Sequence, residues 1–361
     1  MPVLWGKKYS REDLAKRTGD LSQIAWVTPV ELTEGNERGS RAAILRNAAG
    51  LELVVLPERG MSILDVSYRG IPLAHKSAVG PVHPSYASFH GLDWLSSWPV
   101  GFLTPCGLHN VGSPCVDNGE EHGLHGRISS IPAKQVTTTA QWTDDGDCEI
   151  SVSGVMRETR VFGDNLALTR RIFARIGDPV FWVEDTVENA GLAPVEYMFL
   201  QHINLGWPLL DEHTRLMLPP CSTLARDGEA EKGIEQWNSF LPPQIEYNEQ
   251  VFYHDCRPDA DGFVQAAVVN PEFENRTGLG VYLQYSRDEY PVLVEWKMMR
   301  QGLYVLGIEP ANCHVEGRVR ERARGSLQMI NPGEKKSFTL EIGVLCGAKE
   351  LERLEKDFDW N

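Results

Sequence analysis

One acidic residue in the last third of the chain stands where an apolar stretch gives way to proline. Leu303–Ile308 is mostly apolar, and Glu309 and Pro310 follow it directly. Because proline has no amide hydrogen to donate to a sheet ladder, the pattern predicts a strand that ends near Glu309. Burial of a carboxyl there would raise its pKa toward the range of a general base. The alternative is a strand-end ion pair between Glu309 and Arg318 or Arg320.

A second candidate lies in a strand-like stretch near the middle of the chain. Residues 197–210 read YMFLQHINLGWPLL. Period-two alternation places His202 and Asn204 on one face of such a strand and Gln201 and Ile203 on the other. An imidazole and a carboxyl in different environments can act as acid and base near neutral pH. A core histidine with satisfied hydrogen bonds explains His202 equally well.

Two more histidine-bearing stretches are shorter. Residues 121–127 read EHGLHGR, in which glycine near His125 permits close approach of a ligand or another backbone segment. His122 of the same stretch is also explained as a solvated side chain. The stretch VFYHDC brings His254 and Asp255 to the end of another predicted strand, where an Asx-type turn is the alternative.

Other chemistries find less support in the sequence. There is no GxSxG elbow, GxGxxG motif or phosphate-binding loop, which argues against serine-hydrolase and nucleotide chemistry. Imidazoles suit Zn, Fe or Mn, so His122, His125, His202 and His254 could form a metal site. However, an HxxH on an irregular loop is a weak signal, and no HxH pair is present. We therefore expect neither a metal nor another cofactor.

Short alternating segments dominate the elements that would position these residues. Turn residues recur at the spacing of an all-β sandwich or barrel, and no linker or repeat divides the chain. We predict one antiparallel β domain over residues 1–361, with 1–30 as an N-terminal extension and a short helix within 348–361. The predicted strands are Val30–Thr33, Arg41–Arg46, Leu51–Leu56, Ala133–Thr139, Glu149–Glu158, Asn165–Ile176, Val180–Glu188, Pro194–Leu200, Phe263–Val269, Gly280–Tyr285, Val292–Lys297, Leu303–Ile308, Ser326–Met329 and Lys336–Leu345.

Residues 78–128 differ from the rest of the chain. The passage is rich in Gly, Pro, His and Trp, shows little periodicity, and holds five of the ten histidines. Long irregular loops in a soluble domain are usually functional. Aromatic rings such as Trp94 and Trp98 next to imidazoles are a suitable lining for a sugar-sized ligand. Each tryptophan taken alone is equally consistent with a core position.

Composition limits the class of partner. The 361 residues carry a formal charge of −15, which argues against nucleic acid or an anionic membrane as partner. No stretch approaches the ~20 apolar residues of a membrane span, and the opening MPVLWGKKYSRED lacks a signal-peptide core. The seven scattered cysteines include no CxxC. Reduced thiols and a cytoplasmic location are expected.

Several short motifs together resemble the aldose 1-epimerase (galactose mutarotase) superfamily, most closely its uncharacterised, DUF4432-type epimerase-like branch. They are RGM at 59–61, TPCGL at 104–108, LHGR at 124–127, QHINLG at 201–206 and IEP at 308–310. The resemblance extends over residues 40–345, and the order of the motifs makes the combination specific. It implies a galactose mutarotase-like β-supersandwich with a sugar cleft on one concave sheet.

The resemblance also implies roles for individual residues. Glu309 would take the proton from the anomeric hydroxyl, and His202 would protonate the ring oxygen. We therefore expect the two groups to face each other across a gap the width of a pyranose. His125 would be a second sugar-contacting histidine. The other substrate-binding candidates are Arg59, Arg127, Asn204, Asp255, Trp296 and Asn312.

The TPCGL segment departs from the asparagine-rich lead of typical mutarotases and leaves the substrate open. Three functions fit: a mutarotase of an aldose or sugar derivative, a non-catalytic sugar-binding protein, and a metal-dependent sugar isomerase. Arg59, Arg127 and Arg318 would suit an acidic substituent on the sugar or pair with carboxylates. Exposed sheet edges are compatible with a monomer or a homodimer.

Overall fold

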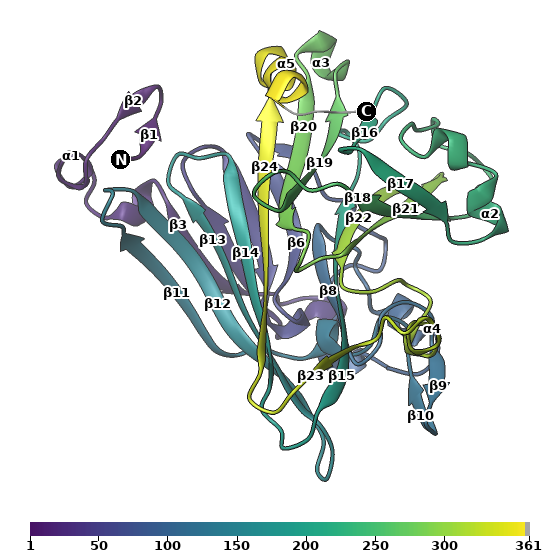
Figure 1. The fold of residues 1–361 in the computed structure, drawn as a ribbon. Coiled ribbons are helices and arrows are strands. Elements are labelled where there is room, and N and C mark those ends of the chain that lie inside the picture. The colour runs from purple at the N-terminus through teal and green to yellow at the C-terminus, as the bar shows by residue number, and fades with distance from the viewer. Residues whose placement is uncertain (358–361) are drawn as a thin grey trace.

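Two antiparallel sheets form the framework of the structure, a computed structural model that describes residues 1–357 (Figure 1). The larger sheet has the order β17 (Cys221–Ala225), β18 (Gln250–Cys256), β21 (Val292–Arg300), β22 (Leu303–Ala311), β15 (Val195–Leu205), β8 (Leu103–Leu108), β6 (Ser62–Tyr68), β5 (Leu51–Leu56), β4 (Arg41–Arg46) and β3 (Trp26–Glu31). Two short strands extend it, β7 (Ile71–Pro72) beside β6 and β23 (Gln328–Ile330) beside β15.

The smaller sheet lies in front of β3 and β6 in Figure 1. Its order is β11 (Lys134–Trp142), β12 (Cys148–Thr159), β13 (Asn165–Arg175), β14 (Val180–Asn189), β24 (Lys335–Cys346), β20 (Leu279–Ser286), β19 (Phe263–Asn270) and β16 (Arg215–Met217). The predicted all-β fold class is confirmed.

Short elements decorate the two sheets. β1 (Val3–Leu4) pairs with β2 (Lys7–Lys8), and β9 (Cys115–Asp117) pairs with β10 (Glu120–His122). The helices are α1 (Arg11–Ala15), α2 (Gly228–Glu231), α3 (Phe273–Arg276), α4 (Arg318–Arg324) and α5 (Ala348–Asp357). The predicted C-terminal helix is therefore present as α5, and residues 358–361 of that prediction lie outside the described residues.

Alternation explains why the sheets pack face to face. In β14 the odd-numbered residues from Phe181 to Val187 are buried, while the residues between them are partly exposed. Phe181 meets Phe102, which directly precedes β8 of the larger sheet, and Phe199 of β15 meets Phe338 of β24 with ring centroids 4.9 Å apart. Strand β15 is buried on both faces, because its other face lies beneath a second apolar cluster that includes Trp94 and Trp98.

The strand that carries Glu309 does not end there, contrary to the prediction. β22 continues through Glu309 and Pro310 to Ala311. Pairing with β21 is continuous, whereas pairing with β15 is found at Ile308 and Ala311 but not at the two residues between them. The ladder thus accommodates Pro310 by omitting a stretch of pairing next to it. Glu309 lies inside the sheet rather than at its edge.

The irregular passage over residues 78–128 also contains a strand that the sequence does not predict. β8 lies between β6 and β15 in the larger sheet, and every residue in it is buried. Pro105 and Gly107 disfavour a central strand, which is why the prediction missed it. The predicted strand starting at Pro194 likewise continues to Leu205 as β15, so His202 is part of that strand.

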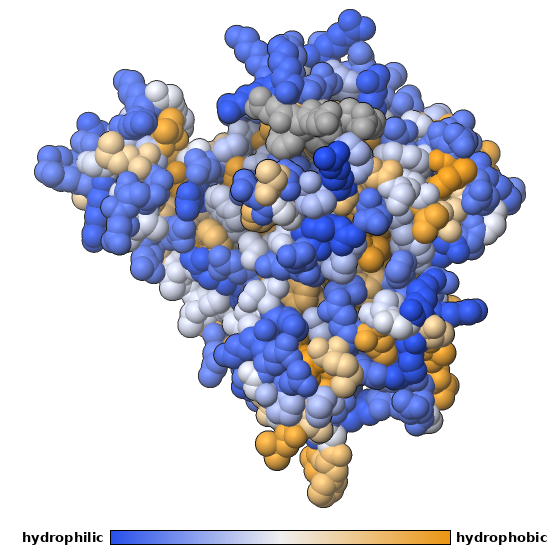
Figure 2. Space-filling model, in the orientation of Figure 1, coloured by the Kyte–Doolittle hydropathy of each residue, from blue (hydrophilic) through white to orange (hydrophobic). Residues whose placement is uncertain are grey.

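The face of the molecule in Figure 2 is mostly hydrophilic, and apolar residues appear on it in small groups. This surface fits the formal charge of −15. Among the helices of residues 1–357, none has the length and apolar character needed to cross a membrane.

Candidate active site

His202 and Glu309 are cross-strand neighbours in the larger sheet. Pairs on either side of them, Leu200 with Ala311 and Ile203 with Ile308, set a register in which His202 of β15 lies opposite Glu309 of β22. Their side chains meet on the face away from the smaller sheet, with His202 Nδ1 3.2 Å from Glu309 Oε1. Two distant segments are therefore brought into contact by strand register alone.

Glycine at position 307 makes room for the carboxyl. Gly307 lies two residues before Glu309 and so on the same face of β22. A Cβ atom at this position would come within 2.4 Å of Glu309 Oε1 and 3.0 Å of Trp296 Cβ. A side chain at residue 307 would therefore displace the carboxyl from its place beside His202.

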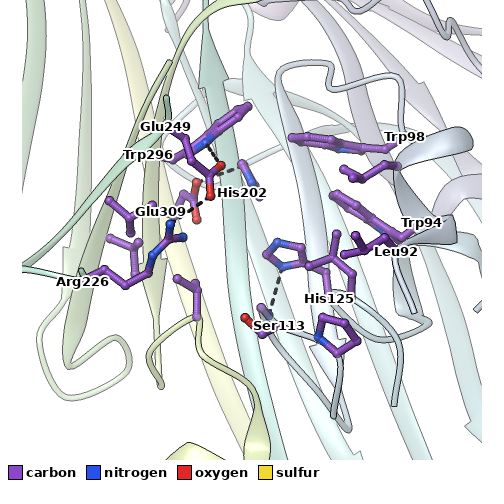
Figure 3. Close-up of a pocket in the computed structure, with 17 residues that line it drawn as sticks. Leu92, Trp94, Trp98, Ser113, His125, His202, Arg226, Glu249, Trp296 and Glu309 are labelled. Carbon is purple, nitrogen blue, oxygen red and sulfur yellow. Dashed lines mark hydrogen bonds and ion pairs between the residues drawn. The ribbon is translucent and has the colours of Figure 1, made fainter. Parts of the chain in front are cut away.

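The pair forms the floor of a cavity of about 260 Å³. Figure 3 shows Trp94, Trp98 and His125 on one side of this cavity and Glu309 and Trp296 on the other, with His202 between them. The volume is close to the lower end of the range for small-molecule sites. The other lining residues are Leu92, Leu95, Gly112, Ser113, Pro114, Leu124, Arg226, Glu249, Val251, Val294 and Val315.

Tryptophan ring faces supply much of the apolar wall. Trp94 and Trp98 stack with centroids 4.4 Å apart, and Trp98 lies 5.8 Å from Trp296. Each indole N–H already has a partner: Trp94 donates to Ser129, Trp98 to Thr104 and Trp296 to Glu249. The indoles therefore offer ring faces to a ligand, and such faces pack well against the C–H surface of a sugar.

The LHGR turn delivers His125 to the cavity. His125 has a positive φ of 56°, donates its backbone N–H to Gly112 and accepts from Gly107 through its carbonyl. A Cβ atom on Gly126 would approach the Gly107 carbonyl oxygen to 2.4 Å, so a larger residue would push the turn away from β8. The close packing holds the His125 ring 5.5 Å from that of His202.

Burial keeps the central pair uncharged. It raises the pKa of the Glu309 carboxyl well above its usual range, and Glu249 adds to the rise. Burial, followed by the His125 ring, lowers the pKa of His202 well below its usual range. Glu309 Oε1 and His202 Nδ1 are close, but neither has a hydrogen-bond partner within residues 1–357. Both residues line the cavity, so a ligand bound there is able to supply the missing hydrogen-bond partners.

A protein-family model matches most of the length of the chain. Residues 37–344 match the model described as a domain of unknown function, DUF4432. The chain belongs to the DUF4432 family. No curated protein matches the sequence.

Solved structures place the DUF4432 chain among mutarotase-like folds. A Klebsiella pneumoniae protein provisionally named an aldose 1-epimerase is 26% identical, with 92% of this chain and 86% of that one covered and a TM-score of 0.86. A galactose mutarotase-like protein from Clostridium acetobutylicum is 13% identical, covering 90% and 99%, with a TM-score of 0.61. A galactose 1-epimerase from Lactobacillus acidophilus is 14% identical over the same shares, with a TM-score of 0.56.

These likenesses confirm the predicted galactose mutarotase-like fold. The Clostridium and Lactobacillus structures speak for the fold alone at their identities. The predicted membership of the DUF4432-type branch is confirmed as well. Four of the predicted site residues of this DUF4432 chain line the shared cavity, namely His125, His202, Trp296 and Glu309.

Two predicted asparagines do not reach the cavity. Asn204 donates to the carbonyls of Gly101 and His202, and Asn312 accepts from the Phe199 backbone N–H at 2.7 Å. Both are buried. Their amides satisfy backbone groups around β15, so they support the strand that carries His202 rather than contact a ligand.

The predicted charged binding residues are also placed elsewhere. Asp255 is 69% exposed and pairs with Arg287 at 2.5 Å, because it lies on the solvent side of β18. Arg59 is buried and donates to the Ser97 carbonyl behind the tryptophan wall, where burial lowers its pKa to about 10. Arg127 lines a different cavity. None of the three belongs to the lining of the cavity that holds Glu309.

Two alternatives from the sequence are corrected by contacts elsewhere in the DUF4432 chain. Arg318 pairs with Asp117 and Glu196 instead of Glu309. His254 is a buried core histidine within β18, bonded to Thr223 at 2.9 Å and to Glu295 at 3.1 Å, and not part of a terminal turn. The proposed four-histidine metal site is therefore not assembled, and the described residues contain no group of three potential metal ligands.

Sequence reasoning missed an ion pair on the cavity wall. Arg226 follows β17, Glu249 precedes β18, and the two meet at 3.0 Å beside Trp296 (Figure 3). Both lie within residues 201–250, a stretch with many prolines and acidic groups and no periodic pattern to give their direction. Pairing of β17 with β18 is what brings them together.

Proposed function

We propose that this protein is a carbohydrate mutarotase that interconverts the α and β anomers of an aldose or a closely related sugar derivative. The observation that carries the proposal is the contact between His202 and Glu309 in the floor of a tryptophan-lined cavity, with a polar atom of each left unpaired. The likeness to a Klebsiella protein provisionally named an aldose 1-epimerase supports it.

Ring opening needs one proton removed and one delivered. Glu309 takes the proton of the O1 hydroxyl while the electrons of that O–H bond form the C1=O1 double bond. The C1–O5 bond breaks, and O5 takes a proton from His202. Rotation about C1–C2 followed by the reverse transfers closes the ring as the other anomer. No net proton is gained or lost, and general acid and base groups supply about 10²- to 10⁴-fold in such steps.

The contact between the two groups corrects the expected spacing. We expected a gap the width of a pyranose, whereas Nδ1 of His202 and Oε1 of Glu309 are 3.2 Å apart. O1 and O5 are bonded to the same carbon, so acid and base need to reach neighbouring atoms and not opposite ends of the ring. A sugar lying over the pair with C1 facing the floor meets that requirement.

The burial of the pair defines its resting state. A protonated Glu309 beside a neutral His202 is the arrangement that burial favours, and it is also the arrangement that follows ring opening. Ring opening of the cyclic sugar starts with the proton on His202 and with Glu309 ionised. The O1 hydroxyl at Oε1 and the ring oxygen at Nδ1 supply the hydrogen bonds that the protein itself does not give to this charged distribution.

Replacement of Glu309 by glutamine tests the proposal. The amide keeps the shape of the side chain but cannot accept a proton, so anomer exchange should fall to the uncatalysed rate. Exchange is measured by NMR or polarimetry across a panel of aldoses and acidic sugar derivatives. Glu52→Gln, which removes an exposed carboxyl that pairs with Arg46, is the matched control. Unchanged exchange in Glu309→Gln would show that another group is the base.

The same panel separates catalysis from binding alone. Calorimetric titration of wild type with each sugar identifies those that occupy the cavity. If a sugar binds and its exchange is not accelerated at any protein concentration, the protein is a sugar-binding protein and the mutarotase proposal is wrong. If exchange is accelerated and Glu309→Gln retains binding, the carboxyl acts in the chemical step.

A further inference from the structure

A second cavity lies on the opposite side of the LHGR turn. It has a volume of about 290 Å³ and includes Gly123, Gly126 and Arg127, whereas Leu124 and His125 of the same turn line the tryptophan-walled cavity. The proposed mutarotase mechanism uses no residue of this second cavity. Its other lining residues are Phe89, His90, His109, Glu121, His122, Glu158 and Arg160.

Arg127 is the cation in this cavity that lacks a polar partner. Its guanidinium lies 4.8 Å from the centre of the Phe89 ring. Among residues 1–357 no carboxylate or carbonyl accepts a hydrogen bond from it, and its Nε is buried. A buried guanidinium N–H without an acceptor costs about 1–3 kcal/mol or more, so such groups normally have a partner. An acceptor that enters the cavity would remove this cost.

Glu158 faces the same cavity and is nearly as isolated. Its side chain is buried, and its one hydrogen bond within the described chain is a 3.4 Å contact from the Leu108 backbone N–H. Burial raises the pKa of this carboxyl to about 7, although Arg127 opposes the rise. No ion pair joins Glu158 and Arg127 in the part of the chain that the structure describes. Two groups of opposite formal charge therefore share one cavity and leave a space between them.

The remaining charges around this space are balanced or absent. Arg160 pairs with Glu120 at 2.5 Å, and both act on Glu158 in opposite senses. Burial lowers the pKa of His109 to about 4 and that of His122 below its usual value, so both rings are neutral near pH 7. Glu121, the other carboxylate of the lining, lies 3.4 Å from the ring of His90 and is exposed.

We propose that this cavity binds the oxyanion group of a small molecule, a carboxylate or a tetrahedral phosphate or sulfate, between the guanidinium of Arg127 and the carboxyl of Glu158. One oxygen accepts hydrogen bonds from the guanidinium, whose fork suits oxyanions. Another oxygen accepts the O–H of Glu158. The site is separate from the sugar cavity and does not depend on the mutarotase proposal.

The proton on Glu158 gives the site a pH signature. A bound anion and an ionised Glu158 repel each other, so the anion binds the protonated carboxyl more tightly. Affinity should therefore be high below a pH of about 7 and fall as the pH rises through the pKa of Glu158. His90, His109 and His122 also line this cavity, and the Glu158→Gln variant separates any contribution of theirs from that of Glu158.

Calorimetric titration of the full chain with sulfate and, separately, acetate tests the proposal at about pH 6 and about pH 8, on either side of the Glu158 pKa. Neither anion changes charge in this range. We expect one anion to bind, more tightly at the lower pH. Tighter sulfate binding indicates a phosphate- or sulfate-bearing ligand, and tighter acetate binding a carboxylate. If neither binds wild type at either pH, the proposal is wrong.

Three variants locate the binding. Arg127→Gln should weaken binding about tenfold or more, the loss expected for a charged hydrogen-bond donor. Glu158→Gln keeps a donor without a titrating proton, so binding should persist and no longer depend on pH. Arg46→Gln, at an exposed ion pair with Glu52, is the control and should bind as wild type. Unchanged affinity in Arg127→Gln, or the wild-type pH dependence in Glu158→Gln, would place the anion elsewhere and overturn the assignment.

Discussion

Both faces of strand β15 carry buried polar groups, but these are hydrogen-bonded on one face and partly unpaired on the other. On the face toward the smaller sheet, Gln201 accepts from Arg170 at 2.7 Å and donates to Asp185 at 2.6 Å. Arg170 and Asp185 also form two direct hydrogen bonds and are fully buried. On the other face, one residue along the chain, His202 meets Glu309 with a polar atom of each unpaired.

This difference separates structural from functional polarity within one strand. A satisfied buried network stabilises one arrangement of the sheets and leaves nothing to offer a ligand. An unsatisfied pair costs stability and is retained where a ligand completes it. Burial alone does not distinguish the two clusters, since all of their members are buried. The state of their hydrogen bonds does.

The largest loss of stability is expected from a substitution on the face of β15 toward the smaller sheet, where the buried polar groups are hydrogen-bonded. Asp185→Ala removes the partner of Arg170 and leaves an uncompensated charge between the sheets, which costs about 3–5 kcal/mol of unfolding free energy. Urea denaturation of variant and wild type measures the loss. Glu309→Gln at about pH 4, where the Glu309 carboxyl is mostly neutral in the unfolded chain as well as in the fold, should change the same quantity by about 1 kcal/mol or less, because it exchanges one neutral buried side chain for another. Equal losses in the two variants would remove the contrast between the faces.

On the other face of β15, Glu309 should instead make the stability of the fold depend on pH. The pKa of Glu309 is raised in the folded protein, so its contribution to stability is complete below its unfolded pKa of about 4.3 and is lost as pH rises toward the folded value. The loss relative to Glu309→Gln approaches about 1.4 kcal/mol per pH unit within that window. His202 acts in the opposite sense, but it is present in both proteins.

Urea denaturation of wild type and Glu309→Gln at a series of pH values gives the difference directly. The exposed variant Glu52→Gln serves as the control and should follow wild type at every pH. A difference between wild type and Glu309→Gln that stays constant from acid to neutral pH would show that Glu309 ionises normally in the fold.

Sequence patterns were sufficient to predict strand bounds where period-two alternation is regular. β4 and β5 have the predicted bounds, β13 and β14 each differ from prediction by one residue at one end, and β12 extends one residue beyond the prediction at both ends. The motifs that contain His202 and Glu309 also pointed to two residues that the fold brings into contact, because adjacent central strands position them by register alone. No turn geometry or loop path had to be known for that contact.

The sequence did not predict strands or side-chain orientations that are set by something other than period-two alternation. β8 is a central strand despite Pro105 and Gly107, since its neighbours β6 and β15 hold it in place. Arg226 and Glu249 come from non-repetitive segments, so no period indicates where their side chains point. Asp255 follows from the family resemblance as a binding residue, but it comes directly after the buried His254, and consecutive residues of a strand face opposite sides.

A smaller effect is expected at the cavity wall. Trp296→Phe keeps an aromatic face toward the sugar but removes the N–H that Glu249 accepts at 2.9 Å. The carboxylate of Glu249 then keeps only its Arg226 partner, and the wall loses rigidity. We expect affinity for the best sugar to fall about two- to tenfold, with kcat nearly unchanged. Titration with the sugar and anomer-exchange kinetics measure the two quantities, and a lower kcat at unchanged affinity would contradict this role for the wall.

The smallest effect on stability is expected at Asp255, which is next to the buried His254 in β18. Asp255 points to solvent and pairs with Arg287, whereas His254 is fully buried against Glu295. Exposed ion pairs contribute about 0–1 kcal/mol, so Asp255→Asn should change unfolding free energy by less than about 0.5 kcal/mol and leave anomer exchange intact. His254→Asn strips the acceptor Glu295 of its ring donor and should cost about 1–3 kcal/mol. If Asp255→Asn is the more damaging of the two, the side of β18 that faces the protein interior has been assigned the wrong way round.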